Sequence, residues 1–328
     1  MIIPNSMIVS TGSAVPDKVL TNHDLEQMVD TTDEWIRTRT GIEKRHIAAE
    51  DQYTSDLATA AAKKAMEKAN VTPEELDYII LATITPDVGF PSTACFVQKN
   101  LGAVNAAAMD ISAACTGFIY ALELADTLIT TNKAKTILII GAETLSKVTD
   151  YTDRATCVLF GDGAGAAIVK PAENSRGVLG TFTKSNGDLH YLLHIPGMGT
   201  KHLPTHDSLE QHLHYIKMAG REVFKYAVTA MGDAAIKIIE DTGLNNDEID
   251  LLISHQANLR IIDATAKRAK MPSERVFVNV NNYGNTSAAS IPIALDEAIT
   301  TGKVSMGSTV VLVAFGAGFT WGSAAIKL

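Results

Sequence analysis

The sequence contains few cysteines and no long apolar run. Its three cysteines are too few for a disulfide framework, and no Cys/His spacing matches a zinc site, so we expect no metal. A reducing, cytoplasmic setting fits this cysteine content best. No run of about eighteen apolar residues occurs, so we expect no membrane-spanning helix. The N-terminal residues 1–6 lack the basic start and the apolar core of a signal peptide.

Positive charge is also scarce. The chain has 28 Lys and Arg against 37 Asp and Glu, and its formal net charge is −9, which argues against general nucleic-acid binding. Hydrophobic residues make up 46% and charged residues 20%, as in ordinary soluble globular enzymes. A length of 328 residues exceeds one average domain, so we expect one large domain or two fused domains.

A weak internal duplication runs through the chain. Two pairs of segments resemble each other at an offset of 173 residues, and a third pair follows at a shorter offset. These pairs are 72–81 with 245–254, 136–141 with 309–314, and 165–169 with 323–327. The repeat predicts two copies of a strand–helix–strand unit that meet near residues 170–178, and hence two halves, 1–172 and 173–328.

Each half alternates short apolar runs with alanine-rich, helix-like stretches. The stretches at 57–69 and 223–241 each precede one of the repeated strands. This alternation favours buried, largely parallel sheets that are covered by helices. The sequence therefore predicts an α/β fold.

Cys115 is the first candidate for chemistry. It stands between a strand-like run and a helix-like stretch, 118–129, with apolar residues three and four apart. A helix N-terminus favours thiolate over thiol, and the thiolate is the nucleophile in acyl transfer. The alternative is a buried structural cysteine. Position 115 plus 173 is Ala288, so the turn that carries Asn285 should be pseudo-symmetric to the cysteine turn, and both should meet between the halves.

His255 is the second candidate, because it follows directly on an apolar strand, 251–253. Polar residues at the carboxyl end of a strand are the usual ligand contacts in α/β sheets. His255 could be a base, a metal ligand, a hydrogen-bond donor or simply structural. We expect six further histidines to be mostly solvated: His190, His194, His202, His206, His212 and His214.

Two glycine-rich turns complete the candidates. Residues 315–322 could bring backbone N–H groups close to a reacting carbonyl, or could be turn chemistry alone. Residues 160–165 run into a strand and not into a phosphate-binding helix, so we interpret them as a packing turn.

Four motifs together resemble one family. Cys115 in Ala-Ala-Cys-Thr-Gly, His255 in His-Gln-Ala-Asn and Asn285 in Tyr-Gly-Asn-Thr-Ser look like the Cys–His–Asn triad of β-ketoacyl-acyl-carrier-protein synthase III. Residues 30–42 are similar to that family's coenzyme A-binding segment, and the match runs nearly end to end. The resemblance implies a thiolase-like fold, with two duplicated halves and mixed, largely parallel sheets in an α-β-α-β-α arrangement.

The resemblance also implies an acyltransferase of fatty acid initiation. Cys115 would take the acyl group of a short acyl-CoA, with acetyl-CoA as the first choice. Malonyl-acyl-carrier protein would then lose carbon dioxide, and the neutral N–H groups of His255 and Asn285 would stabilise its enolate. The N–H groups of Cys115 and Ala317 would form the oxyanion hole. Many relatives carry glycine at position 317, so the backbone there must tolerate a Cβ. No cofactor is implied besides the coenzyme A thioester, which is a substrate.

Binding residues carry over in the same way. Trp35 would stack on the adenine of coenzyme A with Arg154 on its other face. Phe90 would reach in from a neighbouring subunit to floor the acyl pocket, which implies a homodimer. The other expected contacts are Thr31 and Arg39 with the nucleotide, Gly220 and Asn258 with the pantetheine tunnel, and Leu159 and Phe224 with the acyl pocket. Each of these arginines could instead be a surface charge.

Residues 258–270 are expected to form an amphipathic helix with concentrated positive charge. Its cations are Arg260, Lys267, Arg268 and Lys270. Such a run is usually a solvated face, but beside an active-site mouth it could steer an acidic carrier protein.

Other enzyme classes remain open on the sequence. A thiolase needs a second cysteine near residues 315–322, which contain none. A sister condensing enzyme could use another acyl-CoA starter, or coenzyme A thioesters alone. A thioester hydrolase would not need Asn285, and a non-catalytic subunit would usually have lost Cys115.

Overall fold

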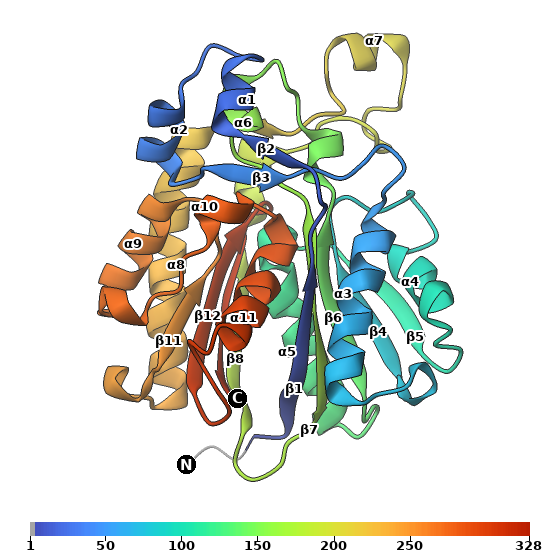
Figure 1. Ribbon diagram of the computed structural model, residues 1–328, viewed down its shortest axis with the longest axis vertical. Coiled ribbons are helices and arrows are strands. Elements are labelled where there is room, and N and C mark those ends of the chain that lie inside the picture. The colour runs from blue at the N-terminus through green and yellow to red at the C-terminus, as the bar shows by residue number, and fades with distance from the viewer. Residues whose placement is uncertain (1–3) are drawn as a thin grey trace.

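Two mixed β-sheets face each other in the computed structural model, which describes residues 4–328 (Figure 1). The first three residues of the segment tested for a signal peptide therefore lie outside it. The first sheet has the strand order β1 (Ser6–Ala14), β7 (Gly163–Pro171), β6 (Ile137–Glu143), β4 (Tyr78–Ala82) and β5 (Ala107–Ile111). The second has the order β11 (Leu251–Ser254), β12 (Thr309–Gly316), β13 (Thr320–Lys327) and β8 (Gly177–Ser185).

Both sheets combine parallel and antiparallel pairs. Strand β4 runs parallel to β5 and β6, and β11 runs parallel to β12. Strands β7 and β13 are antiparallel to both of their neighbours. Since parallel neighbours end at the same edge, the loops after β4, β6, β11 and β12 come together there.

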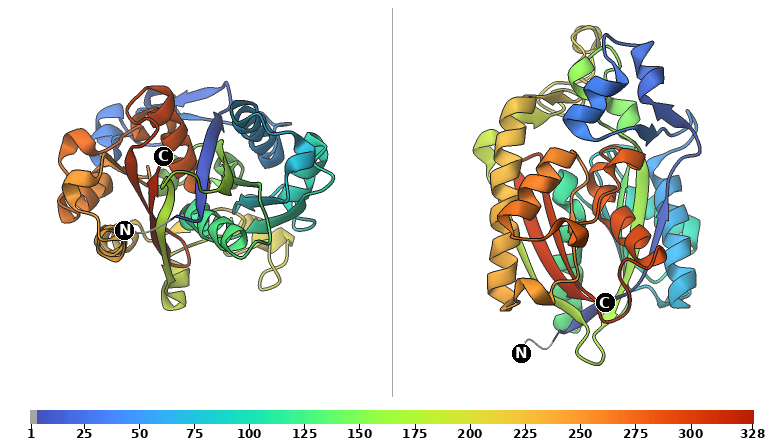
Figure 2. Two further views of the ribbon diagram at one scale, coloured as in Figure 1. Left: turned by 90° about the horizontal axis from the view of Figure 1, so that it is seen from below. Right: turned by 60° about the vertical axis from the view of Figure 1, so that its left-hand side comes forward.

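Helices form a layer between the sheets and a layer on each outer face (Figure 2). The central layer consists of α5 (Gly117–Thr130) and α11 (Ser290–Thr300), each of which contacts strands of both sheets. The outer layers consist of α3 (Thr54–Ala69) and α4 (Thr93–Leu101) on the first sheet, and α8 (Gly220–Thr242) and α9 (Leu259–Arg268) on the second. The expected α-β-α-β-α layering of an α/β fold is confirmed.

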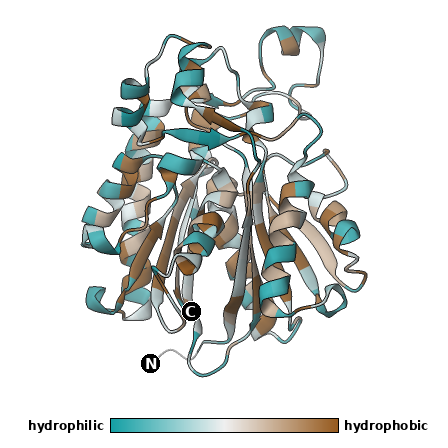
Figure 3. Cartoon of the chain, viewed as in Figure 1, coloured by the Kyte–Doolittle hydropathy of each residue, from teal (hydrophilic) through white to brown (hydrophobic). Residues whose placement is uncertain are grey.

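The core follows these layers. Phe118 and Leu122 of α5 and Ile291 and Leu295 of α11 are fully buried between the sheets. Separate apolar clusters lie under α3 and under α8. The central elements are accordingly apolar along much of their length, while the outer helices carry hydrophilic outward faces (Figure 3). Within residues 4–328, no helix combines the length and the apolar character needed to cross a bilayer.

The duplication seen in the sequence is also present in the backbone. Strands β4, β6 and β7 of the first sheet correspond to β11, β12 and β13 of the second. The turns repeat in detail, since Ala114 and Ser287, 173 residues apart, both have φ = 47° and both open a 3₁₀ turn. The predicted pseudo-symmetry of the cysteine turn and the asparagine turn is confirmed. The division at residue 172 remains a prediction.

A cap of short elements covers the edge where the central loops meet (Figure 1). It contains β2 (Val19–Thr21), β3 (Lys44–His46), α1 (Asn22–Glu26), α2 (Asp33–Thr40), α6 (Arg154–Cys157), α7 (His206–Glu210), β9 (Leu193–His194), β10 (Lys217–Met218) and α10 (Val280–Tyr283). The fully buried Arg45 ties this cap to the loops beneath it. Its guanidinium donates to Asn22 Oδ1 at 2.8 Å and to the Val158 carbonyl at 2.7 Å.

Candidate active site

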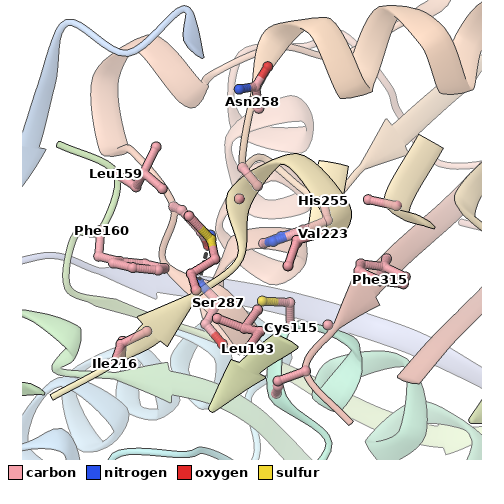
Figure 4. A pocket seen from close by; sticks show the side chains of 18 of the residues that line it. Cys115, Leu159, Phe160, Leu193, Ile216, Val223, His255, Asn258, Ser287 and Phe315 are labelled. Carbon is pink, nitrogen blue, oxygen red and sulfur yellow. Dashed lines mark hydrogen bonds between the residues drawn. The ribbon is translucent and has the colours of Figure 1, made fainter. Parts of the chain in front are cut away.

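One cavity under the cap is lined by all three residues of the expected triad. Figure 4 shows Cys115 and His255 in it. Cys115 belongs to the first half of the chain, and His255 and Asn285 belong to the second. The 3₁₀ turns that carry Cys115 and follow Asn285 contact each other. The convergence predicted from the 173-residue offset is therefore confirmed.

The position of Cys115 is fixed by its neighbours. Ala114 adopts the left-handed conformation, and α5 begins two residues after the cysteine, at Gly117. A Cβ on Gly316 would lie 2.6 Å from the Cys115 nitrogen, so the close approach of the end of β12 to the cysteine turn requires glycine at this position. Burial raises the pKa of the Cys115 thiol to about 12. Burial therefore opposes the thiolate form that the helix N-terminus was predicted to favour.

His255 is held as a neutral imidazole. It follows β11 as predicted, and its backbone N–H donates to the Val313 carbonyl at 2.8 Å. Burial lowers its pKa to about 3. Its Nδ1 atom is buried and has no hydrogen-bond partner among residues 4–328. A neutral ring has one N–H group to donate, which suits the expected role and does not suit a strong base.

The side-chain NH₂ group of Asn285 is available to donate hydrogen bonds. Its side-chain Oδ1 accepts a hydrogen bond from the Ser287 N–H at 2.9 Å. Its backbone exchanges hydrogen bonds with Leu159 and Gly161 at 2.9 and 3.0 Å. The oxygen is therefore occupied, and the NH₂ group of this cavity-lining side chain is left to act as a donor.

Ala317 lines the same cavity, and it is not among the described residues with positive φ. The backbone at this position thus tolerates a Cβ, as the sequence required. Residue 317 follows directly on β12, beside Gly316 and close to Cys115. Ala317, one of the two residues expected to form the oxyanion hole, is therefore the neighbour of the glycine that contacts the other, Cys115.

Sequence comparison assigns the chain to a family. Residues 109–187 match the profile of 3-oxoacyl-[acyl-carrier-protein (ACP)] synthase III, and residues 239–328 match that of its C-terminal part. A β-ketoacyl-[acyl-carrier-protein] synthase III of Caldanaerobacter subterraneus is 54% identical over 98% of this chain and 97% of its own length. The crystal structure of the Aquifex aeolicus 3-oxoacyl-[acyl-carrier-protein] synthase III is 51% identical, with a TM-score of 0.92, covering 98% of this chain and 100% of that one.

The chain belongs to the β-ketoacyl-acyl-carrier-protein synthase III family. It is thus an acyltransferase-type condensing enzyme with a thiolase-like fold. The priming β-ketosynthase of the R1128 polyketide pathway is a more distant structural relative. It is 33% identical, with a TM-score of 0.92 over 100% of this chain and 97% of that one.

The expected coenzyme A segment of this synthase III forms a cationic, aromatic patch on the cap. The Cζ atoms of Arg39 and Arg154 lie 4.8 and 5.0 Å from the centre of the Trp35 ring. Arg154 also donates to the Asp30 carbonyl at 2.7 Å, which joins α6 to the loop before α2. The Thr31 hydroxyl is buried with no hydrogen-bond partner among the described residues. The structure thus brings Trp35, Arg39 and Arg154 together, and their role in binding coenzyme A remains a prediction.

The expected pantetheine and acyl residues lie along the synthase III cavity. Gly220, Asn258, Leu159 and Phe224 all line it. Asn258 caps α9 and donates from Nδ2 to the Arg39 carbonyl at 3.0 Å, so it links the cavity to the nucleotide patch. Phe90 does not line the cavity of the single chain and is 89% exposed.

Helix α9 forms where the amphipathic pattern predicted it, but its charges are not equivalent. The Arg260 guanidinium lies 5.2 Å from the centre of the Phe224 ring, at the cavity wall. Lys267 and Arg268 lie at the far end of the helix, and Arg268 is paired with Asp233. Of the cations of this helix, Arg260 is therefore the one that packs on a residue of the cavity wall.

Sequence reasoning missed several residues of the site. Glu143 and Ser287 are buried beside the cysteine, and Ser287 and Gly316 line the cavity. Of the six histidines predicted to be mostly solvated, His190, His202 and His206 are exposed and the other three are half-buried. His194 lines the cavity, and His212 bonds the buried Asp150 at 2.7 Å. The glycine turn at 160–165 packs against neighbouring backbone, as predicted.

Proposed function

We propose that this synthase III joins a short acyl-CoA to malonyl-acyl-carrier protein with loss of carbon dioxide, giving 3-oxoacyl-acyl-carrier protein at the start of fatty acid synthesis. Acetyl-CoA is the proposed primer. One observation carries the proposal: a buried cysteine shares a cavity with two uncharged N–H donors, His255 and Asn285. That set of groups suits a reaction that builds negative charge on a thioester oxygen.

The first half-reaction is acyl transfer to Cys115. Its sulfur attacks the thioester carbon, coenzyme A leaves, and the acyl group stays on the enzyme. The N–H groups of Cys115 and Ala317 stabilise the oxyanion of the tetrahedral intermediate. Support comes from the close approach of Gly316 to the Cys115 nitrogen, which keeps the two N–H groups near one point.

The second half-reaction is decarboxylation and carbon–carbon bond formation. Loss of carbon dioxide from the malonyl group leaves an enolate, whose oxygen accepts hydrogen bonds from His255 and Asn285. The enolate carbon then attacks the acyl group on Cys115. Donors that carry no charge need no proton exchange with solvent during this step, which agrees with the pKa of His255, lowered to about 3 by burial.

Substrates are proposed to enter past α2, α6 and α9. Trp35, Arg39 and Arg154 would hold the adenine nucleotide, and Asn258 and Gly220 would flank the pantetheine arm. Arg260 would receive the acidic carrier protein at the entrance. No cofactor takes part in these steps, because the coenzyme A thioester is itself a substrate.

We further propose a homodimer in which Phe90 closes the acyl pocket of the partner. An aromatic ring that is 89% exposed, near the half-exposed Val88, supports this assignment. Sedimentation of the wild type and of Phe90→Asp tests it. A monomeric wild type would refute the homodimer.

The direct test of the function is a reconstituted condensation. Purified protein, acetyl-CoA and malonyl-acyl-carrier protein should yield 3-oxobutyryl-acyl-carrier protein and carbon dioxide, and Cys115→Ala should yield no condensed product. Isobutyryl- and hexanoyl-CoA are run in parallel. A strong preference for either would favour a related condensing enzyme that uses another acyl-CoA starter. Free acid without condensed product would instead identify a hydrolase.

A further inference from the structure

A buried carboxylate that the proposed reaction does not use lies behind the nucleophile. Glu143 ends β6 and has no exposed surface. Its oxygens accept hydrogen bonds from the hydroxyls of Thr83 and Thr85 at 3.1 and 2.6 Å, and from the N–H groups of Ile84 and Thr85 at 3.1 Å. None of these partners is charged, and no cation pairs with Glu143 among residues 4–328.

Ser287 links this carboxylate to the active-site cavity. Its turn contacts both β6 and the turn of Cys115, and its side chain lines the cavity with the cysteine (Figure 4). Ser287 is 2% exposed, and its hydroxyl has no hydrogen-bond partner among the described residues. It lies close enough to lower the pKa of both Cys115 and Glu143. A buried hydroxyl without a hydrogen-bond partner, on a turn that contacts both the strand of Glu143 and the turn of Cys115, needs an explanation.

The chemistry of acyl transfer supplies one. Cys115 must lose a proton to attack a thioester, yet burial raises its pKa to about 12. His255 is a poor acceptor, because burial lowers its pKa to about 3. Burial raises the pKa of Glu143 to about 7, which makes this carboxylate the stronger base of the two.

We propose that the Ser287 hydroxyl passes the proton of the Cys115 thiol to the Glu143 carboxylate during acyl transfer. This inference rests on the proposed acylation of Cys115. The S–H bond breaks, and its electron pair forms the bond to the acyl carbon. The proton moves to the Ser287 oxygen while the Ser287 proton moves to Glu143. The acyl–sulfur bond to coenzyme A then breaks, and the departing thiolate takes one proton back through Ser287, which restores the carboxylate.

Few other ionisable groups face this relay. The titratable side chains that line the cavity are Cys115, His194 and His255. Burial lowers the pKa of His194 as well. Glu143 itself is surrounded by threonine hydroxyls, backbone N–H groups and Ser287. Glu143 does not touch the substrate, so its role is to act through Ser287.

The test measures the rate of Cys115 acylation by acetyl-CoA as a function of pH, in single turnovers followed by intact-protein mass spectrometry. In the wild type the rate should rise through about pH 7, as Glu143 ionises, and then level off. Ser287→Ala and Glu143→Gln should each slow acylation at neutral pH by about 10²-fold or more. Both should lose the inflection near pH 7 and gain rate at higher pH as the thiol itself ionises. The double variant should be no slower than the slower single variant, since both act on one path.

Two matched variants control for lost packing. Ser323→Ala removes a fully buried hydroxyl, and Asp296→Asn changes a buried carboxylate, both outside the cavity lining. Each should keep the wild-type profile. Isolated acyl-enzyme of Ser287→Ala, prepared by long incubation, should condense with malonyl-acyl-carrier protein at the wild-type rate.

Several outcomes would overturn the relay. Wild-type acylation rates in Ser287→Ala, an unchanged inflection in either variant, or independent losses that multiply in the double variant would each do so. If Cys115 of the wild type were not acylated, that result would instead contradict the proposed function itself.

Discussion

Gly316 should be one of the most sensitive positions outside the triad. A Cβ built on it would lie 2.6 Å from the Cys115 nitrogen and 3.2 Å from the Cβ atoms of Ala114 and Cys115. Gly316→Ala must therefore push the cysteine turn away from the end of β12. The glycine has no positive φ, so the effect comes from this contact and not from backbone strain.

The size of the effect follows from the overlap. A contact of 2.6 Å is about 0.8 Å short of ordinary van der Waals contact, so the turn must shift by close to that amount. Overpacking of this kind typically costs about 1–3 kcal/mol of stability. A displacement of about 1 Å at a reacting atom can cost on the order of 10²-fold in rate. We therefore expect a folded enzyme with a roughly hundredfold slower acylation of Cys115.

The assay is stopped-flow or quenched acylation by acetyl-CoA, together with thermal unfolding. The matched control is Gly187→Ala, since a Cβ there meets no atom within 4 Å. The control should match the wild type in both measurements. Wild-type acylation by Gly316→Ala would refute the view that the approach of β12 positions the nucleophile.

Three further predictions concern the donors, the entrance and the buried acid. Asn285→Ala should leave acylation intact and slow condensation by about 10²–10³-fold, measured as 3-oxoacyl product from preformed acyl-enzyme; equal loss in both half-reactions would contradict its role as an enolate donor. Arg260→Ala should raise the KM for malonyl-acyl-carrier protein without changing acylation by acyl-CoA, and Arg268→Ala, which removes a cation already paired with Asp233, should have the smaller effect. Burial raises the pKa of Glu143 from 4.5 to about 7, so the folded state holds this proton more tightly, and stability should fall as pH rises through that window. The loss should be roughly 3 kcal/mol relative to Glu143→Gln, by urea unfolding at pH 4.5 and 8; parallel curves for the two proteins would exclude it.

Much of the fold could be predicted because the chain repeats itself. The offset of 173 residues located matching strands, and it placed the turns of Cys115 and Asn285 together before any geometry was known. The backbone shows why this worked, since Ala114 and Ser287 adopt the same φ of 47° at equivalent positions. Thr31, Trp35 and Arg39 could be predicted as coenzyme A contacts because residues 30–42 resemble one short family segment, whereas Arg154, Gly220 and Asn258 lie elsewhere in the sequence.

Other features depend on burial, which the sequence does not give directly. The helix N-terminus at Cys115 suggested a thiolate, but the pKa of the thiol is set by its depth in the protein. No sequence pattern singled out Glu143, and only its burial and its threonine and backbone partners identify it. His194 lines the cavity because residues 187–218 fold back over it, and no local sequence pattern predicts this long-range contact.

Acylation of Cys115 is the central claim, and one measurement addresses it most directly. The protein is incubated with isotope-labelled acetyl-CoA, digested and analysed by peptide mass spectrometry. We expect one labelled acetyl group on the peptide that contains Cys115, discharged by malonyl-acyl-carrier protein and absent in Cys115→Ala. A label on another residue, or none with any of several acyl-CoAs, would contradict it.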